Sequence, residues 1–174
     1  MRDTGDDRAP GAGWSCVPKP KSYLESSVVS YLAARPSRDV VATAHQQLTR
    51  EWWDRRRSEF DLFVSAEVLN EIRRGDPSAA AIRYALVESL PLLEADDRAR
   101  SLAGAILKSA ALPANAIADA MHIAIATVNG MDFLITWNCA HIANGIVLRT
   151  VTRVCRESGF EPPIVCTPEE LMEG

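Results

Sequence analysis

Residues 114–144 read ANAIADAMHIAIATVNGMDFLITWNCAHIAN and carry the strongest structural signal in the chain. Residues 114–128 are apolar almost all round, which predicts an α-helix packed in the core. Gly130 suits the left-handed backbone position just beyond the end of a helix. The apolar run 133–135 then predicts a central strand that is buried on both faces and ends at residues 136–138. The rest of the sequence is interpreted around this unit of helix, turn and strand.

Two polar side chains interrupt the apolar helix. Asp119 and His122 are three residues apart and therefore share one helix face. A carboxylate in a buried helix costs free energy unless it is paired or bound to a metal ion. Asp119 is therefore a candidate functional residue. His122 is either a core histidine with satisfied hydrogen bonds or a second-shell partner of a site that contains Asp119.

The composition is typical of a soluble globular protein with one domain. The chain has 174 residues, of which 47% are hydrophobic and 24% charged. No apolar run approaches the roughly 20 residues of a membrane span. The first residues lack the apolar region of a signal peptide, so we expect a cytoplasmic location and no membrane contact. The cysteines lack metal-ligand spacing and are interpreted as reduced structural thiols: Cys16, Cys139, Cys155 and Cys166.

The charge balance limits how the protein could bind a nucleic acid. The formal net charge is −4, whereas proteins that bind nucleic acid through their general field are usually basic. Attraction to a phosphate polymer would therefore have to come from local arginines or from bound cations. The absence of a GxGxxG or Walker A pattern argues against an enzyme that uses a nucleotide cofactor.

Predicted strands and helices alternate along the chain. Residues 1–20, rich in charge, Gly and Pro, are expected to be a disordered leader, and residues 21–174 a single domain. The expected strands, besides 133–135, are 21–26, 60–65, 90–93 (or a loop) and 164–167. The expected helices, besides 114–128, are 28–34, 38–58 with Ser37 as its cap, one beginning at Glu67, 77–89, one from 96 or 97 to 110, and 144–157. This alternation predicts an α/β fold with three layers, in which helices flank both faces of a parallel sheet.

Oxygen-bearing side chains follow the predicted strands where a parallel sheet binds its ligands, beyond the carboxyl ends. Glu25 ends the first strand, Glu67 follows the second, and Asn138 ends the central strand. Asp119 lies in the first half of the helix that leads into the central strand, and so near the same edge. Three carboxylates without a matching Lys or Arg repel one another, which indicates a bound cation. Oxygen ligands of this kind suit Mg²⁺ or Mn²⁺.

Four segments together resemble a known family. They are YLESSVVSYL (23–32), VSAEVLNEI (64–72), IADAMHIAIA (117–126) and FLITWN (133–138). In this order and spacing they resemble a PIN domain, of the kind found in the VapC-type toxins of bacterial toxin–antitoxin systems.

The resemblance implies a metal-dependent ribonuclease that holds Mg²⁺ or Mn²⁺ in a ring of four acidic residues. Carried over by position, Glu25, Glu67, Asp119 and Asn138 are the catalytic and metal-binding residues. An RNA substrate, an antitoxin protein as partner and a homodimer are also implied.

Two positions depart from the family pattern. Glu25 and Asn138 both stand where aspartate is usual. Asn138 lowers the charge of the site by one, which makes a two-metal arrangement less secure than a single metal. Ser27 and Thr136 lie near the same edge and could support the ligand residues from behind, orienting water or ligands. Other interpretations stay open: Glu67 could serve only the helix dipole, and Asn138 only the turn after its strand.

Two functional hypotheses follow from the sequence. The first is a metal-dependent endoribonuclease, the toxin of a type II toxin–antitoxin system, in which a metal-activated water attacks phosphorus. The second is a catalytically degenerate PIN-fold module that binds RNA or a protein partner without cleavage, motivated by Asn138. A phosphohydrolase acting on small phosphoesters is a third, weaker interpretation.

Overall fold

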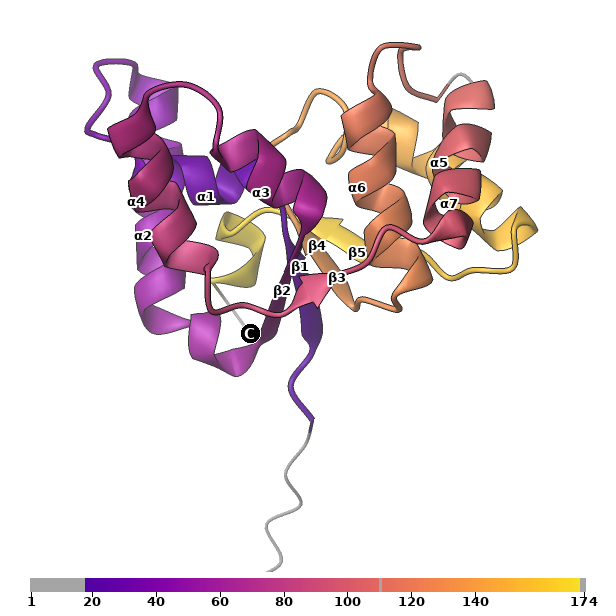
Figure 1. The fold of residues 1–174 in the computed structure, drawn as a ribbon, viewed down its shortest axis with the longest axis horizontal. Helices are drawn as coiled ribbons and strands as arrows, with labels where there is room; N and C mark the ends of the chain where they lie inside the picture. Colours follow the sequence, from indigo (N-terminus) through magenta and orange to yellow (C-terminus); the bar gives the residue numbers. More distant parts are fainter. Residues whose placement is uncertain (1–17, 110, 173–174) are drawn as a thin grey trace, which may run out of the picture.

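A single parallel sheet organises the computed structural model, which describes residues 18–109 and 111–172. Its five strands lie in the order β3-β2-β1-β4-β5, and every neighbouring pair is parallel (Figure 1). The strands are β1 (Lys21–Leu24), β2 (Asp61–Ser65), β3 (Leu92–Leu93), β4 (Phe133–Ile135) and β5 (Ile164–Cys166).

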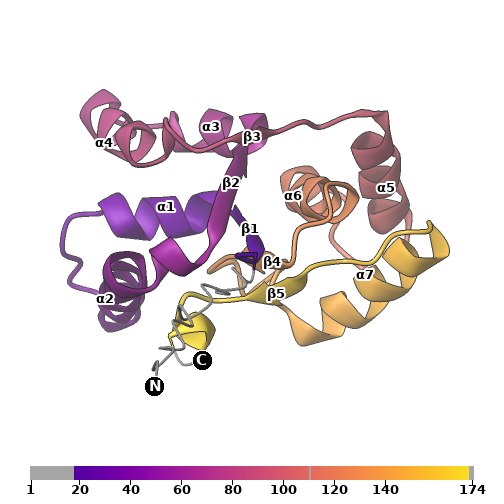
Figure 2. The ribbon, with the colours of Figure 1, turned by 90° about the horizontal axis from the view of Figure 1, so that it is seen from below.

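Helices cover both sides of this sheet (Figures 1 and 2). On one side lie α1 (Ser26–Ala33), α2 (Val40–Arg55), α3 (Ala66–Ile72) and α4 (Pro77–Val87). On the other lie α5 (Asp97–Lys108), α6 (Ile117–Val128) and α7 (Gly145–Glu157). Two short 3-10 helices span Arg57–Glu59 and Glu169–Leu171. The predicted α/β fold with three layers is therefore confirmed.

The strand order reverses at β1, which pairs with β2 on one edge and with β4 on the other. Leu24 and Ile135 are partners in the register, so the residues after β1 and β4 leave the sheet side by side. The hydrogen bond from the Glu25 amide to the Ile135 carbonyl, at 3.1 Å, extends this pairing by one residue. In open parallel sheets such a reversal opens a crevice beyond the carboxyl ends, where ligands bind.

The predicted core unit forms as expected, except at the start of its helix. Leu134 and Ile135 of β4 are fully buried, and Gly130 adopts the left-handed conformation (φ 62°) at the end of α6. The prediction that α6 begins at residue 114 was wrong, because the Ala116 amide donates to the Pro113 carbonyl in a turn before the helix. The first turn is also less buried than predicted, since Ile117 is 60% exposed.

Capping side chains account for the other shifted boundaries. The first strand ends at Leu24 rather than at residue 26, because the Glu25 carboxylate accepts from the Ser27 amide and starts α1 two residues earlier than predicted. Asp39, and not Ser37, caps α2, which ends at Arg55. The expected strand 90–93 is reduced to the two residues of β3.

Some expectations fall outside the part of the chain that the structure describes. Residues 1–17 of the expected leader and Cys16 belong to this group. Cys139, Cys155 and Cys166 are free thiols, the last two buried, as the sequence predicts. Among the described residues, every helix is too short or too polar to span a bilayer.

We expect the isoleucine truncation Ile135→Ala to destabilise the protein strongly. Ile135 is fully buried in β4, and removing a buried Ile side chain costs about 2–5 kcal/mol through lost burial and cavity formation. Ile164→Ala on β5 is the matched control, because that side chain is 63% exposed and should change stability by less than about 0.5 kcal/mol. Urea unfolding checks this, and similar losses in both variants would contradict the packing described for β4.

Candidate functional site

Glu25 is a buried carboxylate at the junction of β1 and α1. Its exposed fraction is 4%, and its partners are neutral donors. Ser26 Oγ donates to Oε1 at 2.6 Å, and the Ser27 amide and Thr136 Oγ1 donate to Oε2 at 3.1 and 2.8 Å. The Ser27 hydroxyl donates to Oε2 as well. No Lys or Arg among the described residues forms an ion pair with Glu25, so its negative charge is solvated only by dipoles close to it.

Glu71, in the last turn of α3, is the second carboxylate of this cluster. Its Oε2 lies 2.5 Å from Ser26 Oγ, whose single hydrogen is shared between Glu71 and Glu25, and 3.1 Å from His122 Nε2. The hydrogen bond from His122 lowers the pKa of Glu71, more than partial burial raises it. Glu71 is therefore ionised at neutral pH and lies beside the hydroxyl that also binds Glu25.

His122 joins this cluster to two hydroxyls deeper in the core. The side chain is 1% exposed, and its Nδ1 lies 2.8 Å from the Tyr23 hydroxyl, which is 2.6 Å from Ser65 Oγ. Burial works against protonation, but the hydrogen bond to Glu71 and the charges around the ring raise the pKa of His122 overall. Burial also raises the pKa of Tyr23, which keeps its hydroxyl neutral.

Asp119 lies one helical turn before His122 and has its own partners. Its Oδ1 accepts from Asn138 Nδ2 at 2.9 Å, and its Oδ2 lies 2.7 Å from His141 Nδ1. The Asn138 oxygen accepts from the His141 amide at 3.1 Å and so faces away from Asp119. Asp119 and His141 are 18% and 39% exposed, which makes this half of the site the more open to solvent, although Glu71 in the other half is 22% exposed.

Thr136 connects the two halves. Its hydroxyl donates to Glu25 and accepts from the Asn138 amide at 2.9 Å. Burial lowers the pKa of His122, and the two glutamates raise it. The charge of Asp119 adds a smaller contribution in the same direction as the glutamates. The residues predicted from the ends of β1 and β4 therefore meet at the reversal of the strand order.

The second acid of the cluster is Glu71, where the sequence pointed to Glu67. Glu67 lies half-buried in the first turn of α3 and makes none of the side-chain hydrogen bonds of this cluster among the described residues. The two glutamates are four residues apart and share a helix face, so the sequence alone offers both. The structure distinguishes them because α3 packs against both α1 and α6, which brings its last turn between Ser26 and His122.

Sequence reasoning also found no role for His141, which contacts Asp119. The signal for it is its position three residues after Asn138, within the tight turn where the Ile142 amide donates to the Asn138 carbonyl at 3.0 Å. Ser27 and Thr136 lie where the sequence placed them, beside Glu25.

The donor set suits a divalent cation. Glu25, Glu71 and His122 each offer one ligand atom, and these atoms lie within 4.8 Å of one another. Ligand atoms about 2.1 Å from a shared ion lie roughly 3–4.2 Å apart, so small side-chain movements would allow all three to bind one ion. A cation bound in this way would neutralise the negative charges of Glu25 and Glu71, which otherwise share a single neighbouring histidine, His122.

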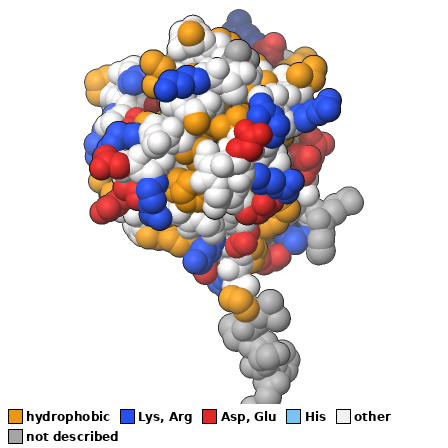
Figure 3. Space-filling view, turned by 90° about the vertical axis from the view of Figure 1, so that its right-hand side faces the viewer, with side chains coloured by type: hydrophobic (Ala, Val, Ile, Leu, Met, Phe, Trp, Pro, Cys, Tyr) orange, Lys and Arg blue, Asp and Glu red, His pale blue; other side chains and the backbone are white. Residues whose placement is uncertain are grey.

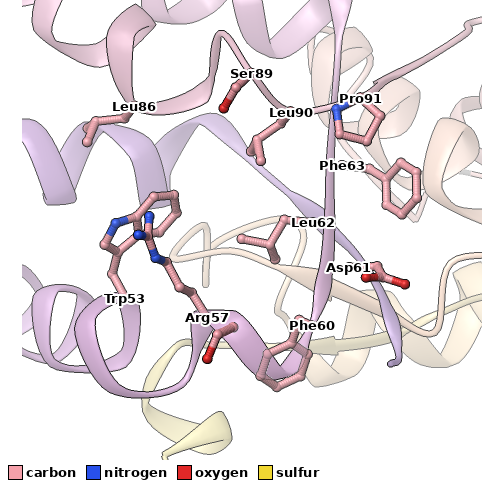
Figure 4. Close-up of a pocket in the computed structure, with 11 residues that line it drawn as sticks. Trp53, Arg57, Phe60, Asp61, Leu62, Phe63, Leu86, Ser89, Leu90 and Pro91 are labelled. Carbon is pink, nitrogen blue, oxygen red and sulfur yellow. The ribbon is translucent and has the colours of Figure 1, made fainter. Parts of the chain in front are cut away.

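A separate cavity of about 380 Å³ lies at the other end of β2 (Figure 4). Asp61, the first residue of β2, lies there, whereas the site is built beyond Ser65, the last. Its walls are mainly apolar, and the Arg57 guanidinium stacks 4.7 Å above the Trp53 ring. It contains no group of acidic side chains, so it is not the candidate site.

Comparison with known proteins supports the fold. Neither protein-family models nor curated protein sequences match this sequence. The structure is similar to that of the Mycobacterium tuberculosis toxin VapC20, described as cleaving the Sarcin-Ricin loop, with a TM-score of 0.53 and 16% identity. The match covers 71% of this chain and 95% of the toxin. The chain therefore has the VapC-like PIN fold that its sequence motifs predicted.

We expect Glu71→Gln to abolish most of the stabilisation by Mn²⁺ that Glu67→Gln leaves intact. Losing a direct ligand should weaken ion affinity by at least the roughly 10–100-fold that loss of an outer-shell partner costs. At saturating ion this removes about 1.4–2.8 kcal/mol of linked stability. Thermal unfolding with and without Mn²⁺ measures it. A loss in Glu67→Gln as large as that in Glu71→Gln would restore the sequence-based assignment.

Asn138→Asp should make folding depend on a divalent ion. The change replaces the amide that donates to Asp119 with a second carboxylate, so without metal two like charges face each other. We expect a loss of about 1–3 kcal/mol in EDTA and a larger stabilisation by Mn²⁺ than in the wild type. Urea unfolding under both conditions checks this, and equal stability in EDTA would contradict the donor role of Asn138.

Proposed function

We propose that this protein is a divalent-metal-dependent endoribonuclease that hydrolyses phosphodiester bonds in RNA. The observation that carries the proposal is the convergence of Glu25, Glu71, Asp119 and His122 at the carboxyl ends of parallel strands. Acidic oxygen ligands at this position suit Mg²⁺ or Mn²⁺. The VapC-like PIN fold and the sequence motifs support the same reaction class.

Some residues of the site would bind the ion, and others orient those ligands by hydrogen bonds. Glu25, Glu71 and Asp119 would bind the ion, which when bound would supply an activated water and neutralise phosphoryl charge. Ser26, Ser27 and Thr136 fix the Glu25 carboxylate, as their hydrogen bonds indicate.

Asn138 is better suited to orient Asp119 than to bind the ion. Its amide nitrogen donates to Asp119, and its oxygen is already used by the His141 amide. We therefore change its expected role from metal ligand to positioning residue. This neutral substitute for an acid also keeps the second interpretation open, in which a degenerate PIN-fold module binds RNA or protein without cutting.

RNA attraction must be local, because the face bearing α5 and α7 has no uniform charge. Figure 3 shows Lys and Arg interspersed with Asp and Glu on that face. Several of these cations are paired with acids: Arg100 with Asp97, Arg153 with Glu157 and Arg156 with Glu161. Near the site, the charge of exposed Arg74 contributes to the lowered pKa of Glu71, after the hydrogen bond from His122. We propose Arg74 as one contact for RNA phosphate.

The wider biological setting follows from the PIN-domain resemblance. We propose that the protein is the toxin of a type II toxin–antitoxin pair, acts in the cytoplasm as a homodimer, and is inhibited by a protein antitoxin. The leader expected at residues 1–20 is given no part in the reaction.

We expect the wild type to cleave end-labelled total RNA with Mn²⁺ and not with EDTA. Asp119→Asn should lower the cleavage rate by more than about 100-fold, because it weakens one ion ligand and its contact with His141. Asp97→Asn is the matched control, since that carboxylate is 99% exposed at the start of α5. Binding of RNA without cleavage in any sample, unaffected by EDTA, would favour the non-cutting module instead.

A further inference from the structure

His122 has one ring nitrogen facing the buried Glu25 and the partly exposed Glu71, and the other facing the core. Nε2 lies 3.1 Å from Glu71 Oε2, within the group of atoms that also includes a Glu25 oxygen. The ring is 1% exposed, and α6 fixes it one turn after Asp119. His122 therefore belongs to the same group of candidate ligand atoms as the two carboxylates.

We propose that His122 is itself a ligand of the metal ion, bound through Nε2 together with Glu25 and Glu71. The inference rests on the proposed metal-dependent function but goes beyond it. It adds an imidazole ligand to the carboxylates and so makes the site a mixed centre of oxygen and nitrogen ligands. An imidazole ligand favours first-row transition ions, so the centre selects Mn²⁺ over Mg²⁺, which prefers oxygen alone.

The contacts behind the ring are those of a metal-bound histidine. Such histidines usually hold their second nitrogen in a hydrogen bond that fixes the orientation and tautomer of the ring. Here Nδ1 lies 2.8 Å from the Tyr23 hydroxyl, which burial keeps neutral and which in turn lies 2.6 Å from Ser65 Oγ. When the ring proton is on Nδ1, that N–H donates a hydrogen bond to the Tyr23 oxygen. The lone pair of Nε2 then points towards the two glutamates.

The same hydroxyls also accommodate the ring without metal. A hydroxyl can donate or accept by rotation of its hydrogen. With Nε2 protonated, the ring donates to Glu71, and the Tyr23 hydroxyl can turn its hydrogen towards Nδ1 if that nitrogen carries none. Binding of an ion through Nε2 requires a neutral ring with its proton on Nδ1. A doubly protonated ring releases its Nε2 proton to solvent, whereas a neutral Nε2–H ring changes to the Nδ1–H tautomer without net loss of a proton. Glu71 then exchanges a hydrogen bond for a bond to the ion.

Mn²⁺ electron spin-echo spectroscopy tests the proposal on the intact protein. Directly bound imidazole produces a nitrogen coupling, and labelling histidine with ¹⁵N should change it. The chain has 3 histidines, His45, His122 and His141. The double variant His45→Gln/His141→Gln therefore keeps only His122, and we expect it to retain the coupling of the wild type. This design leaves the buried histidine in place, so misfolding of a His122 variant cannot obscure the result.

Affinity measurements give a second readout. His122→Gln should weaken Mn²⁺ binding by roughly 10–100-fold and Mg²⁺ binding much less, as measured by calorimetry. Bound Mn²⁺ without nitrogen coupling in the wild type would overturn the proposal, as would a coupling lost in the double variant. RNA cleavage without that coupling would leave the proposed function standing. Nitrogen coupling without any RNA cleavage would leave the mixed centre standing and overturn the nuclease instead.

Discussion

The structure depends on satisfying one carboxylate that is buried inside the protein. Removing an ionised group from water costs several kcal/mol unless hydrogen bonds and opposite charge replace its hydration. Glu25 is 4% exposed, accepts hydrogen bonds from Ser27 and Thr136, and shares the Ser26 hydroxyl with Glu71. These partners come from α1 and from the end of β4, so a satisfied Glu25 requires both elements to be in place. The hydrogen bonds of this buried carboxylate therefore form only when β1 and α1 are packed correctly against β4.

The topology makes this coupling available. Because the strand order reverses at β1, the chain leaves β1 and β4 into opposite helical layers while their carboxyl ends stay adjacent. Helix α3 packs against both α1 and α6 and so connects the two helical layers beyond the strand ends. Three different elements supply the acids. Glu25 follows β1, Glu71 lies in α3, and Asp119 lies in α6. A sheet whose order ran in one direction would place these side chains on one face only.

The sequence predicted most of the fold because local signals agreed with the global one. Apolar runs, capping residues and Gly130 fix the elements, and their alternation implies a parallel sheet. The placement of Glu25 and Asp119 follows from strand ends and helix direction. From the sequence only Glu67 was assigned; that Glu71 faces the cluster instead follows from the packing of α3 against α1 and α6. The orientation of the Asn138 side-chain amide could not be predicted from the sequence either, because the His141 backbone amide fixes it by a hydrogen bond across a turn.

The two halves of the site differ in what they require from a cation. In the solvent-exposed half, the Asn138 amide and the His141 ring occupy both oxygens of Asp119, so this carboxylate is satisfied without metal. In the half around Glu25 and Glu71, the His122 ring is the hydrogen-bonded source of positive charge, and Arg74 makes a smaller contribution at Glu71. An aspartate at position 138 would have left both halves short of positive charge. Asparagine removes this deficit from the half around Asp119, so the need for a cation is concentrated on Glu25 and Glu71, and the low solvent access of Glu25 strengthens its interaction with an ion.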